Sequence, residues 1–239
     1  MFSAGLKPSW IPGIPGIPDS KLVSNNHSHG LVDPFCGSGT IVIEGAAMIL
    51  GLPPGRFRDA CPFQGTQLED SEKWSIEIRR SLAAADIYRQ QLDGGLLLIS
   101  ASDRDPGAVK ATKINAERAG VLDAITIQRA SLSDQTWFET PSAAPNSVLV
   151  VTNPPFGKRV SSKSSSSTKG LLPLYQSLGK YVGCLVGEHE RRVRGVVLTD
   201  NPGLLLRTGA RFPLKTSFKT FHGGLKVSAM GFDLSSSTP

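Results

Sequence analysis

The sequence predicts a doubly wound, Rossmann-like α/β fold, with a mostly parallel sheet and a C-terminal antiparallel hairpin. Short apolar segments typical of buried strands alternate with longer amphipathic segments typical of helices between residues 31 and 199. Polar residues follow three of these strands directly, as ligand-binding corners do in parallel sheets. Near the C-terminus, Gly223 and Gly224 separate two segments typical of strands, which predicts a hairpin that adds an antiparallel strand.

Periodicity and end signals place the individual elements. Asp105 is expected to cap a helix over 106–119, because Pro106 suits its first position and Gly120 follows its end. The other expected helices cover residues 40–50, 73–91 and 172–183. The expected strands cover residues 31–32, 96–99, 124–128, 148–151 and 195–199, and the hairpin covers 212–234.

The chain is expected to contain one domain with irregular additions. Residues 1–30 begin with a Pro-Gly repeat that cannot form a helix, so they are expected to be an irregular N-terminal segment, with the domain over 31–239. Residues 51–95 are expected to be an insertion between the first two strands. Residues 161–170 are rich in Ser and Lys and are expected to form a flexible loop.

Composition limits the partners. The 239 residues carry a formal net charge of +6, which favours an acidic partner such as nucleic acid, with simple solubility as the alternative. No apolar run is long enough to span a membrane. The three cysteines form no C-x-x-C pair, so neither a disulfide framework nor a metal site is expected. The default compartment is therefore the cytoplasm, with an organelle as the alternative because the N-terminal segment has few acids.

The first corner, Asp-Pro-Phe-Cys-Gly-Ser-Gly-Thr over residues 33–40, is the expected cofactor site. Gly37 and Gly39 allow a sharp turn and a close approach of the backbone, and the helix starting near Thr40 directs free N–H groups toward a ligand. The Asp33 carboxylate disfavours a phosphate but suits the ammonium and sulfonium groups of S-adenosylmethionine. A tight turn without a ligand is the alternative interpretation.

The end of the next strand offers an acid for the same cofactor. Asp103 can accept hydrogen bonds from both ribose hydroxyls, as acids at this position do in nucleotide-binding sheets. Cys36 is expected to be a small buried side chain rather than a nucleophile, because no base lies near it in the sequence.

The other informative corner is Asn-Pro-Pro-Phe over residues 153–156, directly after the apolar segment 148–151. Its Asn and two Pro residues form a rigid polar corner with an aromatic ring beside it. Such a corner suits the binding of a flat NH₂-bearing group, and together with the first corner it predicts methyl transfer from S-adenosylmethionine to nitrogen. A rigid loop with a buried Phe156 is the alternative.

The two corners together resemble the class I methyltransferases that make N2-methylguanosine in structured RNA, namely the THUMP-associated family and its RlmL-type ribosomal RNA members. The resemblance covers residues 31–235. It implies methylation of guanine N2 in RNA, with ribosomal RNA as the expected substrate. The amine would be bound by Asn153 and Pro154, and the base would stack on Phe156. RNA would contact Lys158 and Arg159, and the cofactor would bind Asp33, Phe35, Gly37, Gly39, Thr40, Asp103 and Ser131.

The chain departs from this family in several places. The THUMP domain is missing, which points to a separate RNA-binding subunit, and Ser131 and Lys226 stand where the family commonly has acids. Alternative functions are methylation of transfer RNA, DNA adenine or protein glutamine, and a truncated remnant that binds RNA or a partner. A second basic group, Arg191, Arg192 and Arg194, is expected on a solvated edge.

Overall fold

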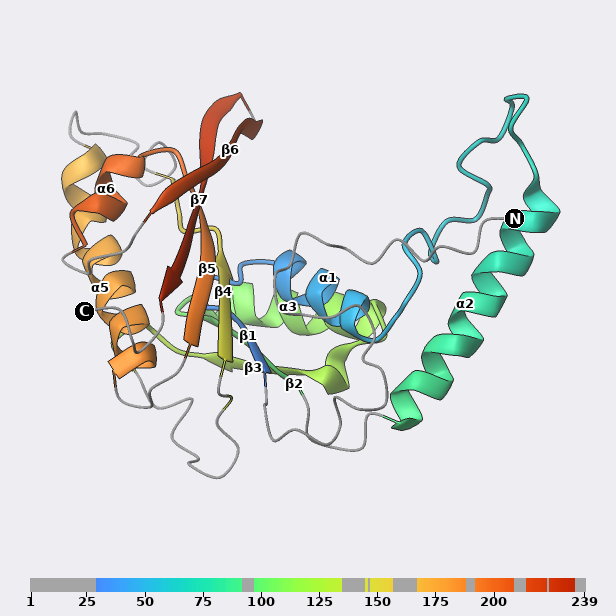
Figure 1. Cartoon of the computed structure of the whole chain (residues 1–239), viewed down its shortest axis with the longest axis horizontal. Coiled ribbons are helices and arrows are strands. Elements are labelled where there is room, and N and C mark those ends of the chain that lie inside the picture. Colours follow the sequence, from blue (N-terminus) through green and yellow to red (C-terminus); the bar gives the residue numbers. More distant parts are fainter. Residues whose placement is uncertain are drawn as a thin grey trace. The chain divides into compact units, whose positions relative to one another are not determined.

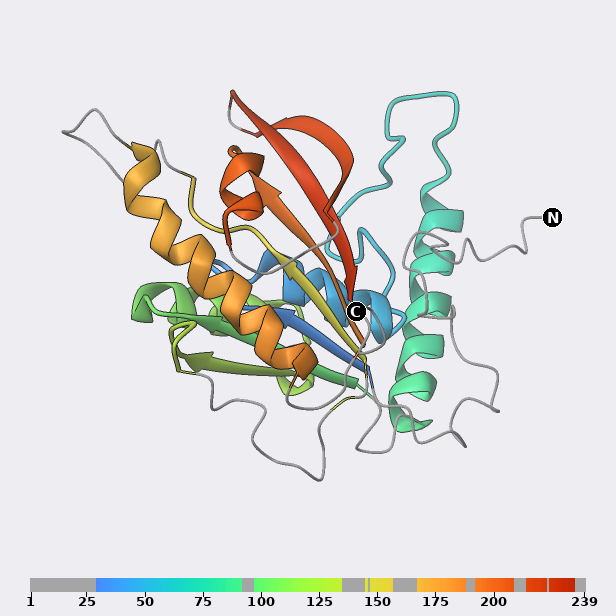
Figure 2. The ribbon, with the colours of Figure 1, turned by 60° about the vertical axis from the view of Figure 1, so that its left-hand side comes forward.

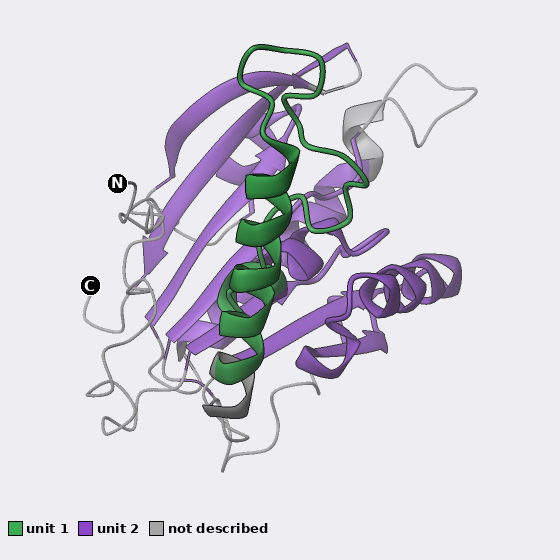
Figure 3. Cartoon of the chain, turned by 90° about the vertical axis from the view of Figure 1, so that its right-hand side faces the viewer, with its two compact units in different colours: residues 1–26, 47–96 green, residues 27–46, 97–239 purple. Residues whose placement is uncertain are grey.

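The computed structural model describes residues 29–91, 97–134, 145, 147–156, 167–187, 192–208, 214–222 and 224–234. Most of the predicted N-terminal segment, together with Lys158 and Arg159, lies outside the described residues. The described chain forms two compact units, one with residues 47–91 and the other with residues 29–46 and 97–234 (Figure 3). The larger unit contains the whole sheet and both predicted corners.

A seven-stranded sheet with the order β3-β2-β1-β4-β5-β7-β6 forms the larger unit (Figure 1). The first five strands are parallel, whereas β7 is antiparallel to both β5 and β6. The prediction of a mostly parallel, doubly wound sheet with an antiparallel C-terminal hairpin is therefore confirmed. The strands are β1 (His29–Asp33), β2 (Leu97–Asp103), β3 (Ile125–Arg129), β4 (Ser147–Thr152), β5 (Arg192–Thr199), β6 (Lys215–His222) and β7 (Leu225–Leu234).

Helices lie on both faces of this sheet (Figure 1). On one face, α3 (Pro106–Arg118) packs on β2 and β3, and the short helix η2 (Leu122–Ala124) leads into β3. On the other face lie α5 (Ser167–Gly187) and α6 (Pro202–Leu206). The main hydrophobic core joins α5 and α6 to β4, β5 and β7. The helix α1 (Thr40–Ile49) follows the first corner.

The start of α5 corrects one prediction. The helix begins at Ser167 rather than at Leu172, so it starts within the segment that we expected to be a flexible loop. Leu171, Tyr175, Leu178, Val182 and Leu185 recur at helical spacing and are all buried in the core. Packing of this apolar face stabilises the helix upstream of its first buried residue, although Ser and Lys there favour a loop.

The hairpin of β6 and β7 extends beyond the rest of the sheet. Pairing of β5 with β7 ends at Thr199 and Ser228, whereas pairing of β6 with β7 continues to His222 and Leu225. The hairpin therefore projects past the carboxyl end of β5 (Figures 1 and 2). A bulge interrupts the β6–β7 register between Thr216 and Phe218.

The smaller unit contains α2 (Ser71–Gln91) and the segment before it. Asp70 starts the helix, because its Oδ1 accepts a hydrogen bond of 2.9 Å from the Lys73 amide. Gly55 has a positive φ of 78° and packs near the Trp74 ring. Among the helices of the described chain, none has the length and apolar character that a membrane span requires.

Candidate active site

The first corner is held in place by backbone hydrogen bonds to the end of β2. The Cys36 amide donates to the Ser102 carbonyl at 3.0 Å, and the Gly37 amide donates to Oδ2 of Asp103 at 3.2 Å. The Gly39 amide donates to the Cys36 carbonyl at 2.7 Å, which closes the turn just before α1. The turn is therefore ordered by the protein itself and is prepared for a ligand.

Two side chains of α3 bind the carbonyl groups of the same turn. Thr112 Oγ1 donates to the Gly37 carbonyl at 3.0 Å, and Asn115 Nδ2 donates to the Ser38 carbonyl at 2.9 Å. These bonds fix the turn against α3. Neither α3 residue was predicted, because no sequence signal links them to a turn more than seventy positions away.

The two glycines of the turn have different surroundings. Both have positive φ values, 54° for Gly37 and 87° for Gly39. A Cβ at Gly39 would lie 2.7 Å from Thr112 Cγ2, whereas a Cβ at Gly37 would meet no atom within 4 Å. Gly39 thus allows α3 to pack closely, and Gly37 borders open space that a ligand can occupy.

Asp33 ends β1 and joins the first corner to the end of β4. Its Oδ1 accepts hydrogen bonds from the Phe35 amide at 3.1 Å and from Thr152 Oγ1 at 2.6 Å. The side chain is 1% exposed, and this burial raises the pKa of Asp33 from 3.8 to about 6, with a smaller contribution from the nearby charge of Asp103. Its two hydrogen bonds act in the opposite direction, so a carboxylate is retained at neutral pH.

Asp103 lies half-buried at the end of β2, where two backbone N–H groups fix its carboxylate. Oδ2 accepts from Gly37, and Oδ1 accepts from the Asp105 amide at 3.0 Å. Asp105 itself caps α3 by accepting a hydrogen bond of 2.9 Å from Gly107, which confirms its predicted structural role. Asp105 therefore caps α3, whereas Asp103 contacts the glycine turn.

Ser131 lies in a turn after β3, at the same edge of the sheet as Asp103. The Ala130 amide donates to the Asp103 carbonyl at 3.1 Å, which ties the two strand ends together. The Ser131 amide donates to Oδ2 of Asp134 at 3.0 Å, so an acid does lie beside the position where the sequence has Ser. Sequence reasoning missed Asp134 because the turn, rather than the register of the strand, brings it there.

Asn153 lies just after β4, directly after the Thr152 that binds Asp33. Its side-chain oxygen Oδ1 is buried and has no hydrogen-bond partner among the described residues. A buried acceptor without a donor costs about 1–3 kcal/mol, so such an atom is rare unless a ligand satisfies it. This oxygen is therefore the best candidate in the corner for binding an amine.

Phe156, at the end of the same corner, is 4% exposed. Pro154 is buried as well, whereas Pro155 is exposed. A base can stack on the Phe156 ring only after the side chains that cover the ring move. Phe35 and Thr40 complete the predicted set: Phe35 packs against the main core, and Thr40 Oγ1 lies 3.3 Å from Ser38 Oγ.

A further acid at this edge was not predicted. Asp200 follows β5, and its Oδ1 is buried without a hydrogen-bond partner among the described residues. Thr199 beside it accepts from the Asn201 amide at 3.0 Å and lies 2.8 Å from the Tyr175 hydroxyl. The charge of Asp200, together with the larger effect of burial, raises the pKa of Tyr175, so the carboxylate lies near that ring.

The strand register relates Asp200 to Asn153. Thr152 pairs with Val197, so Asn153 and Asp200 follow neighbouring parallel strands at the same edge of the sheet. With about 3.3 Å per residue and about 4.8 Å between strands, their Cα atoms are separated by roughly 8 Å. Two buried oxygens without hydrogen-bond partners among the described residues thus lie just after the ends of the neighbouring strands β4 and β5.

Neither the cysteines nor the second arginine group supplies further chemistry here. Cys36 is buried as predicted, its burial raises the pKa of the thiol to about 11, and Thr112 Oγ1 lies 3.4 Å from its sulfur. Among the described side chains, no group of three or more His, Cys, Asp or Glu residues is arranged to hold a metal ion.

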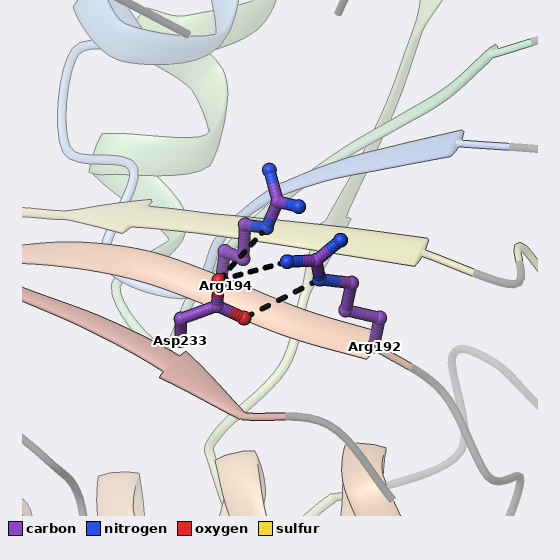
Figure 4. Close-up of polar contacts among 3 residues, drawn as sticks. All are labelled: Arg192, Arg194 and Asp233. Atoms are coloured by element: carbon purple, nitrogen blue, oxygen red, sulfur yellow. Dashed lines mark hydrogen bonds and ion pairs between the residues drawn. The ribbon is translucent and has the colours of Figure 1, made fainter. Parts of the chain in front are cut away.

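Arg192 and Arg194 lie near the amino end of β5, at the edge opposite the two corners, and both contact Asp233 (Figure 4). Arg192 Nη2 lies 3.0 Å and Arg194 Nε lies 3.3 Å from Oδ2 of Asp233 on β7. The side chain of Arg194 is only 18% exposed, so the expected solvated edge is correct for Arg192 and wrong for Arg194. These cations are bound to an acid of the chain itself.

Comparison with known proteins identifies the family of the chain. Residues 21–200 match the family described as RMKL-like, methyltransferase domain. A ribosomal RNA large subunit methyltransferase K/L of Chromohalobacter salexigens is 33% identical over 189 residues, which cover 79% of this chain and 24% of that protein. Its counterpart from Syntrophotalea carbinolica is 31% identical over 85% of this chain and 26% of its own length. The chain thus spans about a quarter of these relatives.

Solved structures show the same fold. SMU.472, in complex with SAH, superposes with a TM-score of 0.62 at 26% identity, over 89% of this chain and 50% of its own. A possible methylase from Clostridium difficile 630 superposes with a TM-score of 0.64 at 23% identity, over 91% of this chain and 51% of its own.

Proposed function

Because the chain belongs to the RMKL-like methyltransferase domain family, we propose that it transfers a methyl group to the exocyclic N2 amine of guanine in RNA. S-adenosylmethionine is the cofactor of this family and supplies an activated methyl group on a sulfonium. The proposed substrate is ribosomal RNA of the large subunit, because the relatives carry that activity in their names.

The residues at the first corner fit this cofactor. Open space beside Gly37 admits a ligand against the backbone, and the Asp33 carboxylate places negative charge at the same turn. Asp103 is half-buried and already oriented by two N–H groups, as an acceptor for sugar hydroxyls must be. Thr112 and Asn115 fix the loop before the ligand arrives, which lowers the entropy that binding must offset.

The second pair of residues supports guanine as the base. The Watson–Crick edge of guanine presents the N1–H donor and the N2 amine side by side, whereas adenine presents an acceptor at N1 beside its amine. Asn153 Oδ1 and Asp200 Oδ1 are both acceptors without donors among the described residues. Their chemistry complements two neighbouring donors, so the pair favours guanine over adenine.

These residues would promote transfer by orienting the amine. The lone pair of an exocyclic amine is delocalised into the ring, and acceptors for its hydrogens favour a pyramidal nitrogen. Asn153 Oδ1 and the Pro154 carbonyl would hold the two hydrogens while the nitrogen forms its bond to the methyl carbon. As the carbon–sulfur bond breaks, both electrons stay on sulfur, and the extra proton of the amine leaves to solvent. Most of the rate gain then comes from positioning.

The observation that carries this proposal is the buried Asn153 Oδ1 beside the Thr152–Asp33 hydrogen bond. Purified protein incubated with labelled S-adenosylmethionine and unmodified ribosomal RNA should yield labelled N2-methylguanosine on nucleoside analysis. Asn153→Ala should lower the rate by about 10²–10³-fold, the usual effect of removing one transition-state hydrogen bond. Lys180→Ala, an exposed change on α5, serves as the matched control.

The outcomes separate the alternatives. Labelled N6-methyladenosine in place of N2-methylguanosine would overturn the choice of guanine. Label in transfer RNA alone would replace the ribosomal substrate. Cofactor binding without any transfer would instead identify a remnant that has kept the first corner and lost the second. Calorimetric titration with S-adenosylmethionine measures that binding directly.

A further inference from the structure

The hairpin of β6 and β7 carries an exposed aromatic side chain between two lysines. Phe221 pairs with Lys226 across the hairpin, and Lys219 pairs with Ser228. Paired residues in antiparallel strands lie on the same face, and alternate residues along one strand share a face. Lys219, Phe221 and Lys226 therefore form one surface, and Phe221 is 74% exposed there.

This surface, which we call the hairpin surface, lies at the edge of the sheet that carries the two corners. Ser228 pairs with Thr199, the last residue of β5, so Phe221 and Lys226 lie beyond the carboxyl end of that strand. The projection is visible in Figure 2. Three strand spacings of about 4.8 Å separate β4 from β6, and Phe221 lies four residues of about 3.3 Å beyond the level of Thr152, so Phe221 is roughly 20 Å from the end of β4. That is close enough for one polymer to reach both places.

The charge of the hairpin fits an anionic polymer. Residues 214–232 contain Lys215, Lys219 and Lys226 and no Asp or Glu. The nearest acid along β7, Asp233, is bound to Arg192 and Arg194 at the other edge of the sheet. Lysines bind phosphates with little sequence preference, and an exposed aromatic ring between them provides a platform on which a base stacks.

We propose that the hairpin surface of Lys219, Phe221 and Lys226 binds single-stranded RNA that adjoins the target nucleotide. The inference rests on the proposed function, because it takes RNA as the substrate. RNA crosses the carboxyl edge of the sheet, one base stacks on Phe221, and the lysines contact the flanking phosphates. A second copy of the chain fits this surface less well, since two hairpins would bring lysines of like charge together.

Binding is tested with fluorescein-labelled, mixed-sequence single-stranded RNA and the full chain, followed by anisotropy over a range of salt concentrations. Phe221→Ala should weaken binding by roughly tenfold, as the loss of one stacked base does. Lys219→Ala and Lys226→Ala should each reduce the slope of log K against log salt by about 0.7. Affinity for S-adenosylmethionine should not change in any of these variants.

Two matched control variants test whether the loss of RNA affinity is specific to the hairpin surface. Phe218 is 55% exposed on the same strand but pairs with Ala229 on the opposite face, so Phe218→Ala should leave RNA affinity unchanged. Lys180→Ala removes one exposed lysine from α5 and should leave the salt slope unchanged. Circular dichroism of each variant establishes that the hairpin still folds.

Four outcomes would overturn the inference. Equal RNA affinity of Phe221→Ala and the unchanged protein would do so while leaving methyl transfer, and thus the proposed function, intact. Equal losses in Phe218→Ala and Phe221→Ala would mean that the hairpin is only structurally required. If the unchanged protein does not bind RNA, this surface is not an RNA-binding site. The same holds if light scattering gives the mass of two chains for the unchanged protein and of one chain for Phe221→Ala. Failure of methyl transfer despite hairpin-dependent RNA binding would count against the proposed function alone.

Discussion

Thr152 donates a hydrogen bond of 2.6 Å to the buried carboxylate of Asp33, and so links the ends of β4 and β1. The bond joins the corner that would hold the cofactor to the corner that would hold the base. Both partners are almost completely buried, so the geometry is held by the surrounding sheet rather than by the solvent-exposed loops.

Replacement of Asp33 should stabilise the fold and weaken the cofactor site. The folded pKa of about 6 exceeds the unfolded value of 3.8, so the carboxylate lowers stability as the pH rises through this window. The free energy of unfolding of Asp33→Asn should therefore equal that of the unchanged protein near the lower end of this pH window. At neutral pH it should be higher by up to about 3 kcal/mol. Thermal unfolding across this pH range measures the difference.

The same substitution should weaken binding of S-adenosylmethionine at neutral pH, because the charge beside the turn is lost. In the unchanged protein, cofactor affinity should decline as the pH falls below about 6, where Asp33 becomes protonated. Calorimetry with Asp33→Asn should show no such decline. A stability that does not differ between the two proteins at neutral pH would contradict the raised pKa.

Loss of the Thr152 hydroxyl should destabilise the protein. Thr152→Val removes the shorter of the two hydrogen bonds to Asp33 Oδ1 and leaves a buried carboxylate with less support. The expected loss is about 1–3 kcal/mol in urea unfolding at neutral pH. Thr152→Ser keeps the hydroxyl and should retain most of that stability, whereas equal losses in both variants would implicate the methyl group instead.

The two glycines of the turn should respond differently to alanine. Gly39→Ala places a Cβ against Thr112 and should destabilise the fold by about 1–3 kcal/mol or more. Gly37→Ala meets no atom, so its effect on stability should be limited to the strain of a positive φ, about 1 kcal/mol. Calorimetry should nonetheless show a clear loss of cofactor affinity for Gly37→Ala. Unchanged affinity would remove the cofactor from this side of the turn.

Asp200 should distinguish guanine from 2-aminopurine, which lacks both the hydrogen at N1 and the oxygen at C6. If its carboxylate accepts from guanine N1–H, then Asp200→Ala should lower kcat/KM by roughly 10- to 100-fold, equivalent to about 1.5–3 kcal/mol. RNA carrying 2-aminopurine at the target has the same amine without a hydrogen at N1. The unchanged protein should discriminate against it, and Asp200→Ala should not. Equal discrimination by both proteins would exclude this contact.

Much of the fold could be predicted because its signals are local. The apolar segments over 148–151 and 195–199 and the cap at Asp105 each depend on a few neighbouring residues. The two corners could be found for the same reason, since each is a continuous motif at a strand end. The corner residues Asp33, Gly37 and Asn153 do lie at one edge of the sheet, as their positions after parallel strands require.

Other features depend on contacts between distant segments. The hydrogen bonds from Thr112 and Asn115 to the glycine turn follow from how α3 packs, which no local pattern encodes. Thr152 carried a usable signal, because a strand paired with β1 must place a side chain beside Asp33. Asp200 carried no such signal in the sequence, because its assignment to the site depends on the burial of its side chain and on the register of β5.

The bulge in β6 has a consequence for the behaviour of the protein at high concentration. β6 is one of the two outer strands of the sheet, and a regular outer strand is a template on which another chain can assemble into fibres. The irregularity between Thr216 and Phe218 breaks the repeat that such assembly needs. The bulge therefore opposes pairing of another chain with an edge strand that exposes Phe218 and Phe221.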